Sequence, residues 1–92
     1  FMSYKIIFSS QADVDLKELK KSEPKAFKKA VALIKELTEH PRTGTGKPTL
    51  KKYDLAGCYA RKITDKHRLV YSIDDDVISV HILSAKGHYN DK

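Results

Sequence analysis

One stretch in the first half of the chain carries apolar residues at helical spacing. These residues follow the i, i+3, i+4, i+7 pattern of an amphipathic helix and are Phe27, Ala30, Val31, Ile34 and Leu37. Pro24 lies in the first turn of this helix, where its missing N–H costs no hydrogen bond, and Pro41 marks its end. Such a helix must bury its apolar face against a second layer, and this requirement constrains the whole fold.

The segments on either side predict what that layer is. A shorter helix comes first, capped by Ser9 or Ser10, with Ala12, Leu16 and Leu19 on one face. Five short β-prone segments complete the pattern: Tyr4–Phe8, Leu50–Leu55, Cys58–Ile63, Arg68–Ile73 and Val77–Leu83. The turns at 64–67 and 74–76 predict an antiparallel meander for the last three, and the last strand is apolar on both faces, which indicates an interior position.

We therefore predict an α+β fold of order β-α-α-β-β-β-β. Two helices from the N-terminal half pack on one face of a mainly antiparallel sheet of four to five strands. The 92 residues form a single domain over residues 2–89, with residues 90–92 as a tail. Phe1 precedes a Met and is interpreted as a remnant of cloning.

Composition narrows the setting in which the chain works. We expect a cytoplasmic protein, because the sequence has no apolar run of membrane-spanning length, no signal peptide and a single cysteine, Cys58. The four histidines and this cysteine show no metal-ligand spacing, so we expect no metal or other cofactor.

Residues 42–71 carry the whole net charge of the chain. They hold eight bases and only two acids, whereas bases and acids cancel in the rest, and the total is +6. A basic segment interleaved with tyrosines is typical of proteins that bind a polyanion such as RNA. The lysines of the two helices are balanced by acids and are interpreted as a solvated surface.

Two separated motifs resemble a known family. They are GKPTLKKYDLAGCYARKITDKHRLVYSID, which begins at Gly46, and SAKGHY near the end of the chain. Both are similar to the YoeB branch of the RelE-type toxins, and the match extends over residues 4–89. The resemblance implies a RelE-like, microbial RNase-like fold. It also implies a toxin of a type II toxin–antitoxin system that inhibits translation.

The family's activity is a ribosome-dependent one. Its members are metal-independent endoribonucleases that cleave messenger RNA in the ribosomal A site, with the 2′-hydroxyl of the RNA as the nucleophile. Such cleavage needs a base for the 2′ proton, positive charge at the phosphate and an acid for the departing oxygen.

The resemblance implies four catalytic residues in this chain. Arg68 would hold the phosphate in bidentate fashion and Lys52 as a point charge. His88 would transfer protons, and Tyr89 would stack on a base or bond a phosphate.

Six further residues are expected to contact messenger or ribosomal RNA. They are Lys62, Arg61, Lys51, Lys47, Tyr59 and Lys66. Lys62 stands where the branch has an arginine, so it would lack the bidentate geometry.

Other positions in the motifs are given mainly structural interpretations. Tyr71 is expected in the core and His81 within its strand, and Cys58 is interpreted as a small packing residue. For His67, at a turn, a structural hydrogen bond and a chemical role both remain open.

Thr49 is the main departure from the family pattern. The branch has a glutamate there, thought to serve as or assist the general base, and a threonine cannot take a proton at neutral pH. Asp54 is the nearest carboxylate in sequence. Our hypothesis is that His88 alone serves as the base.

Two other functions stay open. The chain can be a non-catalytic inhibitor that binds RNA or the ribosome through the same basic surface, which Thr49 favours. It can also be a ParE-like gyrase toxin on the same fold, which the His88–Tyr89 pair opposes. As partners we expect messenger RNA on the ribosome, an acidic antitoxin and a possible second copy of the chain, and no membrane.

Overall fold

The observed elements follow the predicted order. The structure, a computed structural model, describes residues 3–42, 49–50 and 58–87. Its elements are β1 (Lys5–Phe8), α1 (Ser10–Ser22), α2 (Pro24–Leu37), β2 (Thr49–Leu50), β3 (Cys58–Lys62), β4 (Arg68–Asp74) and β5 (Ser79–Ser84). The prediction of an α+β fold with two helices on a mainly antiparallel sheet is confirmed. Neither helix is long and apolar enough to cross a membrane, as far as the described residues show.

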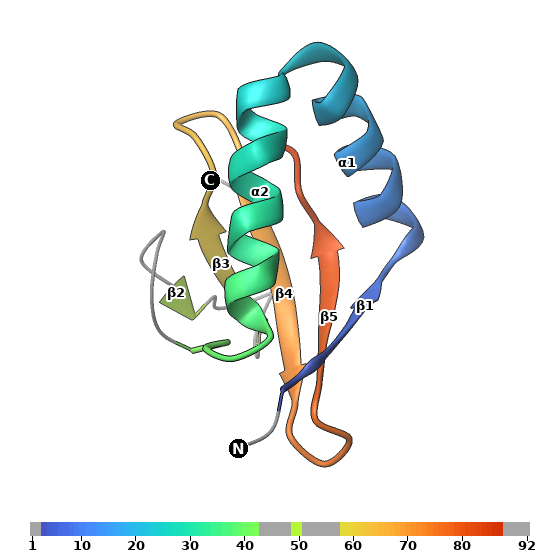
Figure 1. The fold of residues 1–92 in the computed structure, drawn as a ribbon, viewed down its shortest axis with the longest axis vertical. Helices are drawn as coiled ribbons and strands as arrows, with labels where there is room; N and C mark the ends of the chain where they lie inside the picture. The colour runs from blue at the N-terminus through green and yellow to red at the C-terminus, as the bar shows by residue number, and fades with distance from the viewer. Residues whose placement is uncertain (1–2, 43–48, 51–57, 88–92) are drawn as a thin grey trace.

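The five strands form one sheet in the order β1-β5-β4-β3-β2 (Figure 1). β1 pairs with β5 in parallel, and the other three pairs are antiparallel, so the predicted meander is present as β3, β4 and β5. β5 is flanked on both sides, as its apolar pattern predicted. It begins at Ser79 rather than Val77, because Val77 lies exposed in the hairpin and Ile78 has a positive φ of 47°.

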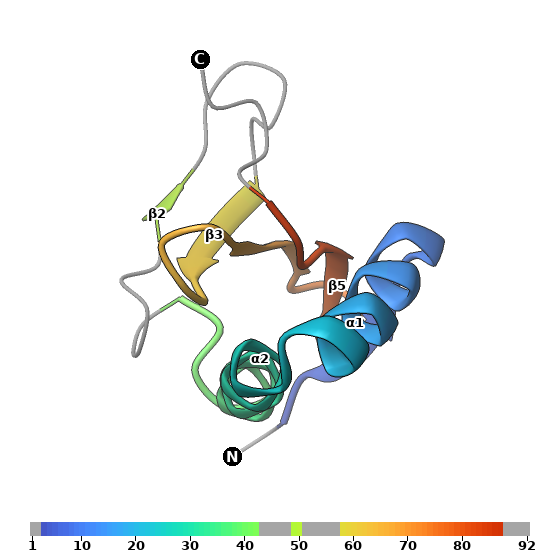
Figure 2. The same ribbon diagram turned by 90° about the horizontal axis from the view of Figure 1, so that it is seen from above.

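Both helices cover the same face of the sheet (Figure 2). The cap of α1 is Ser9, the first of the two predicted candidates. Its Oγ accepts the Ala12 N–H at 3.0 Å and donates to the Leu83 carbonyl oxygen at 2.8 Å. The same hydroxyl therefore caps the start of the helix and fastens it to the segment of β5 that lies beneath it.

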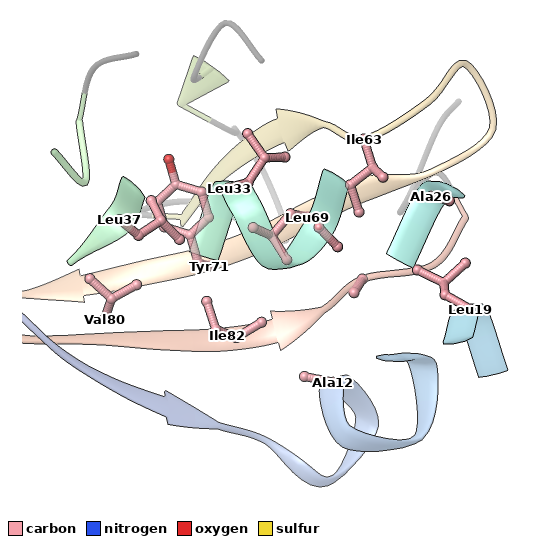
Figure 3. Close-up of a cluster of buried hydrophobic side chains, with 12 residues drawn as sticks. Ala12, Leu19, Ala26, Leu33, Leu37, Ile63, Leu69, Tyr71, Val80 and Ile82 are labelled. Carbon is pink, nitrogen blue, oxygen red and sulfur yellow. The ribbon is translucent and has the colours of Figure 1, made fainter. Parts of the chain in front are cut away.

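The core fills the space between the helices and the sheet (Figure 3). α2 contributes Leu33 and Leu37, and the sheet contributes Leu69, Tyr71 and Ile82, all almost fully buried. The interpretation of Tyr71 as a core residue is thus confirmed. Leu33 was not among the residues expected to define this helix face, although it lies one turn from Leu37 and points to the same side.

Neither α1 nor α2 covers the opposite face of the sheet, here called the open face (Figure 2). Ala60 of β3 and Val70 of β4 are paired across the strands and form a separate small apolar cluster with Cys58 and Leu83. Strand alternation puts residues of the same parity on this face, which include Lys62 and Arg68. At its β3–β4 end the open face therefore combines this apolar cluster with two basic residues.

The double role of Ser9 predicts that alanine substitutions at Ser9 and Ser10 differ in their effect on stability. Ser9→Ala should lower the free energy of unfolding by about 1 kcal/mol, because it removes the cap and the link to Leu83. Ser10→Ala should change it by less than about 0.5 kcal/mol, because Ser10 is exposed. Urea denaturation of both variants measures the difference, and equal midpoints would contradict this account of the cap.

Candidate functional site

Lys62 and Arg68 form the centre of the candidate site. They are directly opposite each other in the β3–β4 register, at the ends of the two strands where the hairpin begins. Directly opposed residues on neighbouring strands point to the same face. The hairpin thus brings together two bases that are six positions apart in the sequence.

The Arg68 guanidinium is held by a main-chain carbonyl group and has no carboxylate partner among the described residues. Its side chain is partly buried, and Nη1 donates to the Thr64 carbonyl oxygen at 3.0 Å. Within residues 3–42, 49–50 and 58–87, no carboxylate forms an ion pair with it. Asp65, the acid nearest to Arg68 in the sequence, pairs with Lys62. A positioned guanidinium of this kind can bind a phosphate by donating hydrogen bonds to its oxygens.

Lys62 and Lys66 supply more mobile positive charge nearby. Lys62 Nζ lies 2.6 Å from Asp65 Oδ1, but the lysine side chain is half exposed and the aspartate is almost fully so. Such a surface ion pair contributes little stability and can be exchanged for a phosphate. Lys66 is exposed in the same turn, so both lysines are accessible from the solvent.

The end of the described chain lies against Arg68. The Arg68 N–H donates to the Gly87 carbonyl oxygen at 3.0 Å, and the Gly87 N–H donates to His67 Nδ1 at 2.8 Å. Gly87 has a φ of +75°, which side-chain-bearing residues rarely adopt. The turn that this glycine permits brings the segment after β5 to the beginning of β4.

His67 takes the structural role that the sequence left open. It is 4% exposed, and its Nε2 lies 2.8 Å from Glu23 Oε2 at the start of α2. The hydrogen bond from His67 lowers the pKa of Glu23 and so favours the ionised carboxylate. His67 thus connects the helix layer to Gly87.

The position of Arg61 corrects one expectation. Its side chain is fully buried on the helix-covered face, where the guanidinium bonds Glu36 Oε1, the His40 carbonyl oxygen and, at 2.9 Å, the Tyr71 hydroxyl. A fully buried guanidinium has no surface to offer RNA, so Arg61 is a core residue in this structure. The sequence was ambiguous because Arg61 and Lys62 are adjacent and strand alternation sends only one of them outward.

The tyrosines near Arg61 belong to the same internal network. Burial raises the pKa of Tyr71, although the hydrogen bond and charge of Arg61 oppose the rise. The Tyr71 hydroxyl donates to the Pro41 carbonyl oxygen at 3.0 Å. Tyr59 is partly buried and stacks on Tyr71 with ring centroids 5.8 Å apart, so one of its ring faces is occupied.

Several expected site residues lie outside the described residues. They are Lys47, Lys51, Lys52, His88 and Tyr89. Thr49 is described only as part of β2, where it is opposite Ala60.

The far end of the open face has the opposite character. A hollow there is lined by Ser72, Asp74, His81 and Leu83 with neighbouring residues, and His81 shares a hydrogen bond with Ser79. Asp74 is six residues along β4 from Arg68, or about 20 Å at about 3.3 Å per residue. The acids make this hollow unsuitable for a phosphate. No group of three or more potential metal ligands occurs among the described side chains.

Sequence and structure comparisons agree on one family. Residues 8–89 match the model of the YoeB-like toxins of bacterial type II toxin–antitoxin systems. The chain belongs to this family. Toxin YoeB of Escherichia coli K12 is 36% identical over 85 residues, which cover 92% of this chain and 99% of the relative.

Solved structures agree with this assignment. A YoeB–YefM complex from Staphylococcus aureus matches with a TM-score of 0.80 at 39% identity, covering 94% of this chain and 98% of that one. A YoeB dimer from the same species matches with a TM-score of 0.81 at 39% identity, covering 95% and 99%. The protein is therefore a type II toxin of the YoeB kind.

The ion pair of the buried Arg61 predicts that substitutions at Arg61 and at its neighbour Lys62 differ in their effect on stability. Arg61→Met should lower the free energy of unfolding by about 3 kcal/mol, because Glu36 and the Tyr71 hydroxyl lose their shared partner. Lys62→Met removes only a surface ion pair and should cost less than about 1 kcal/mol. Urea denaturation distinguishes them; a larger loss for Lys62→Met would reverse our assignment of the two faces.

Proposed function

We propose that this toxin is an endoribonuclease that cuts translated messenger RNA in the ribosomal A site without a metal ion, and so inhibits translation in the cytoplasm. Family membership supports the class. The observation that carries the proposal is Arg68, a positioned guanidinium on the open face with no carboxylate partner among the described residues. Its main-chain contact with Gly87 brings the described end of the chain to the same place.

The reaction is an internal transfer within the RNA. The 2′-oxygen forms a bond to phosphorus while the bond from phosphorus to the 5′-oxygen breaks. A base accepts the 2′ proton and an acid supplies a proton to the leaving oxygen. The products are a 2′,3′-cyclic phosphate and a free 5′-hydroxyl. Negative charge accumulates on the non-bridging oxygens in the transition state, which a fixed cation stabilises.

We assign these roles to residues of the family motifs. Arg68 holds the non-bridging oxygens, with Lys52 as a second cation. His88 transfers the protons, since Thr49 occupies the position of the family's glutamate, and Tyr89 orients the nucleotide. Lys62 and Lys66 contribute contacts with RNA on the same side of the hairpin.

The proposed protein partners follow from charge and from the relatives. One solved relative is a YoeB–YefM complex and another is a YoeB dimer. We propose that an antitoxin with an acidic segment neutralises this toxin, whose net charge is +6. We also propose that two copies of the toxin can pair.

Primer extension on a message under translation tests the function. Discrete cuts within codons, seen only with ribosomes, support the endoribonuclease. An intact message with arrested translation would instead support the non-catalytic inhibitor, the alternative that Thr49 favours. DNA breaks trapped on gyrase would support the ParE-like alternative.

Arg68 should matter most to the chemical step. Arg68→Ala should lower the single-turnover cleavage rate about 100-fold or more, because the developing phosphate charge loses its fixed cation. Lys66→Ala should mainly weaken binding and reduce its salt dependence. Cleavage rates at saturating ribosome concentration distinguish a loss in the chemical step from a loss in binding. Equal rate losses in the two variants would contradict the proposed role of Arg68 in the chemical step.

The missing glutamate gives a second test. His88→Gln should abolish cleavage, because no other group is proposed to take the 2′ proton. Asp54→Asn should leave the rate near that of the unaltered toxin. The same single-turnover assay measures both, and the reverse pattern would transfer the role of base from His88 to Asp54.

A further inference from the structure

Three acidic residues of the helix layer converge on three consecutive residues after β5. Asp15 Oδ2 accepts the Ala85 N–H at 3.0 Å, and Glu18 forms an ion pair with Lys86. Glu23 bonds His67, which in turn accepts the Gly87 N–H. Residues 85–87 are thus held one by one, directly before the His88–Tyr89 pair in the sequence.

The first of these anchors is buried. Asp15 is 5% exposed, and its second oxygen, Oδ1, accepts a hydrogen bond from Gln11 Nε2 at 2.8 Å. Both carboxylate oxygens are therefore satisfied. A buried polar network with all its partners in place is rigid, because any displacement leaves a polar atom unpaired. Asp15 also falls at helical spacing with Ala12 and Leu19, on the face of α1 that packs on the sheet.

The third anchor has a defined direction. The Gly87 N–H can only donate, so His67 Nδ1 must accept and its proton must be on Nε2. Nε2–H then donates to the Glu23 carboxylate. The carboxylate therefore selects the ring tautomer that can hold Gly87.

Glu23 directs its side chain away from its own helix. It is the N-cap residue of α2, a position where a side chain normally bonds a free N–H of the first turn. Its side chain makes no such bond and reaches His67 instead.

We propose that His67, oriented by Glu23, is a positioning residue for the cleavage reaction. It holds Gly87 against the start of β4, beside Arg68, and His88 and Tyr89 follow Gly87 directly in the sequence. The inference rests on the proposed function, and it adds to that function a group that touches neither RNA nor the reacting atoms. Removing the anchor should slow the chemical step and leave the docking of the toxin on the ribosome unchanged.

Two substitutions of His67 separate its two hydrogen bonds. In His67→Asn the amide oxygen is bonded to Cγ, as Nδ1 is in histidine, so it can still accept the Gly87 N–H. The asparagine side chain is too short to reach Glu23. His67→Gln places its polar atoms one bond further out, where they can reach Glu23 but not Gly87. Leu37→Val is the stability control, because it alters the core at the other end of α2.

The test combines three measurements on the full chain. They are Gly87 amide hydrogen exchange by NMR, affinity for ribosomes carrying a message, and the single-turnover cleavage rate at saturating ribosome concentration. We expect His67→Gln to exchange Gly87 faster and to cleave about 10-fold to 100-fold more slowly, with unchanged ribosome affinity. We expect His67→Asn to retain most of the rate and the Gly87 protection, and Leu37→Val to cleave normally.

Three outcomes would overturn the proposal. They are a normal rate for His67→Gln, an equal loss in His67→Asn, or an equal loss in Leu37→Val, which would make the effect one of general stability. If the unaltered toxin makes no cuts at all, the proposed function fails and the positioning role fails with it. Gly87 exchange in the two His67 variants then still reports whether the anchor exists.

Discussion

A single buried guanidinium organises the interface between the helices and the sheet. Arg61 has no access to solvent, so its charge must be met within the protein. Glu36 of α2 supplies the countercharge, and the His40 carbonyl oxygen and the Tyr71 hydroxyl supply the remaining bonds that the structure describes. Because these partners come from α2, from the chain that follows it and from β4, the guanidinium fixes all three relative to β3.

This choice of faces decides what the open face can do. Once Arg61 is directed inward, strand alternation directs Lys62 outward, and the β3–β4 register places Lys62 opposite Arg68. Among the described residues of the open face, the apolar cluster and the acidic far end are unsuitable for a polyanion, whereas the hairpin end is suitable. The core ion pair and the surface site are thus two consequences of one strand register.

The helix layer also reaches the site through polar contacts. None of Asp15, Glu18 and Glu23 was expected near the site, yet each contacts the segment after β5 or the histidine that holds it. For Asp15 the sequence did carry a signal, since it shares the helical spacing of Ala12 and Leu19. An acid on the apolar face of an amphipathic helix needs a buried partner, and here that partner is a main-chain N–H 70 residues away.

Much of the fold could be predicted because its signals are local. The period of α2, the proline at its start and the turns at 64–67 and 74–76 gave the helices, the meander and the interior position of β5. The start of β5 was predicted two residues too early, because Val77 and Ile78 are as apolar as the strand itself and only the hairpin geometry excludes them. For the site, the basic segment and the motif were visible in sequence, whereas the separation of Arg61 from Lys62 was not.

The sequence by itself thus determined the class of fold, the family motifs and the part of the chain that carries the positive charge. Only the tertiary structure decided which bases are available. Arg61 is buried because Glu36 and Tyr71, distant in sequence, provide the partners that a buried charge requires, and Arg68 stays available because no described carboxylate reaches it. Periodicity depends on neighbouring residues, but the burial of a charge depends on partners that only folding brings near.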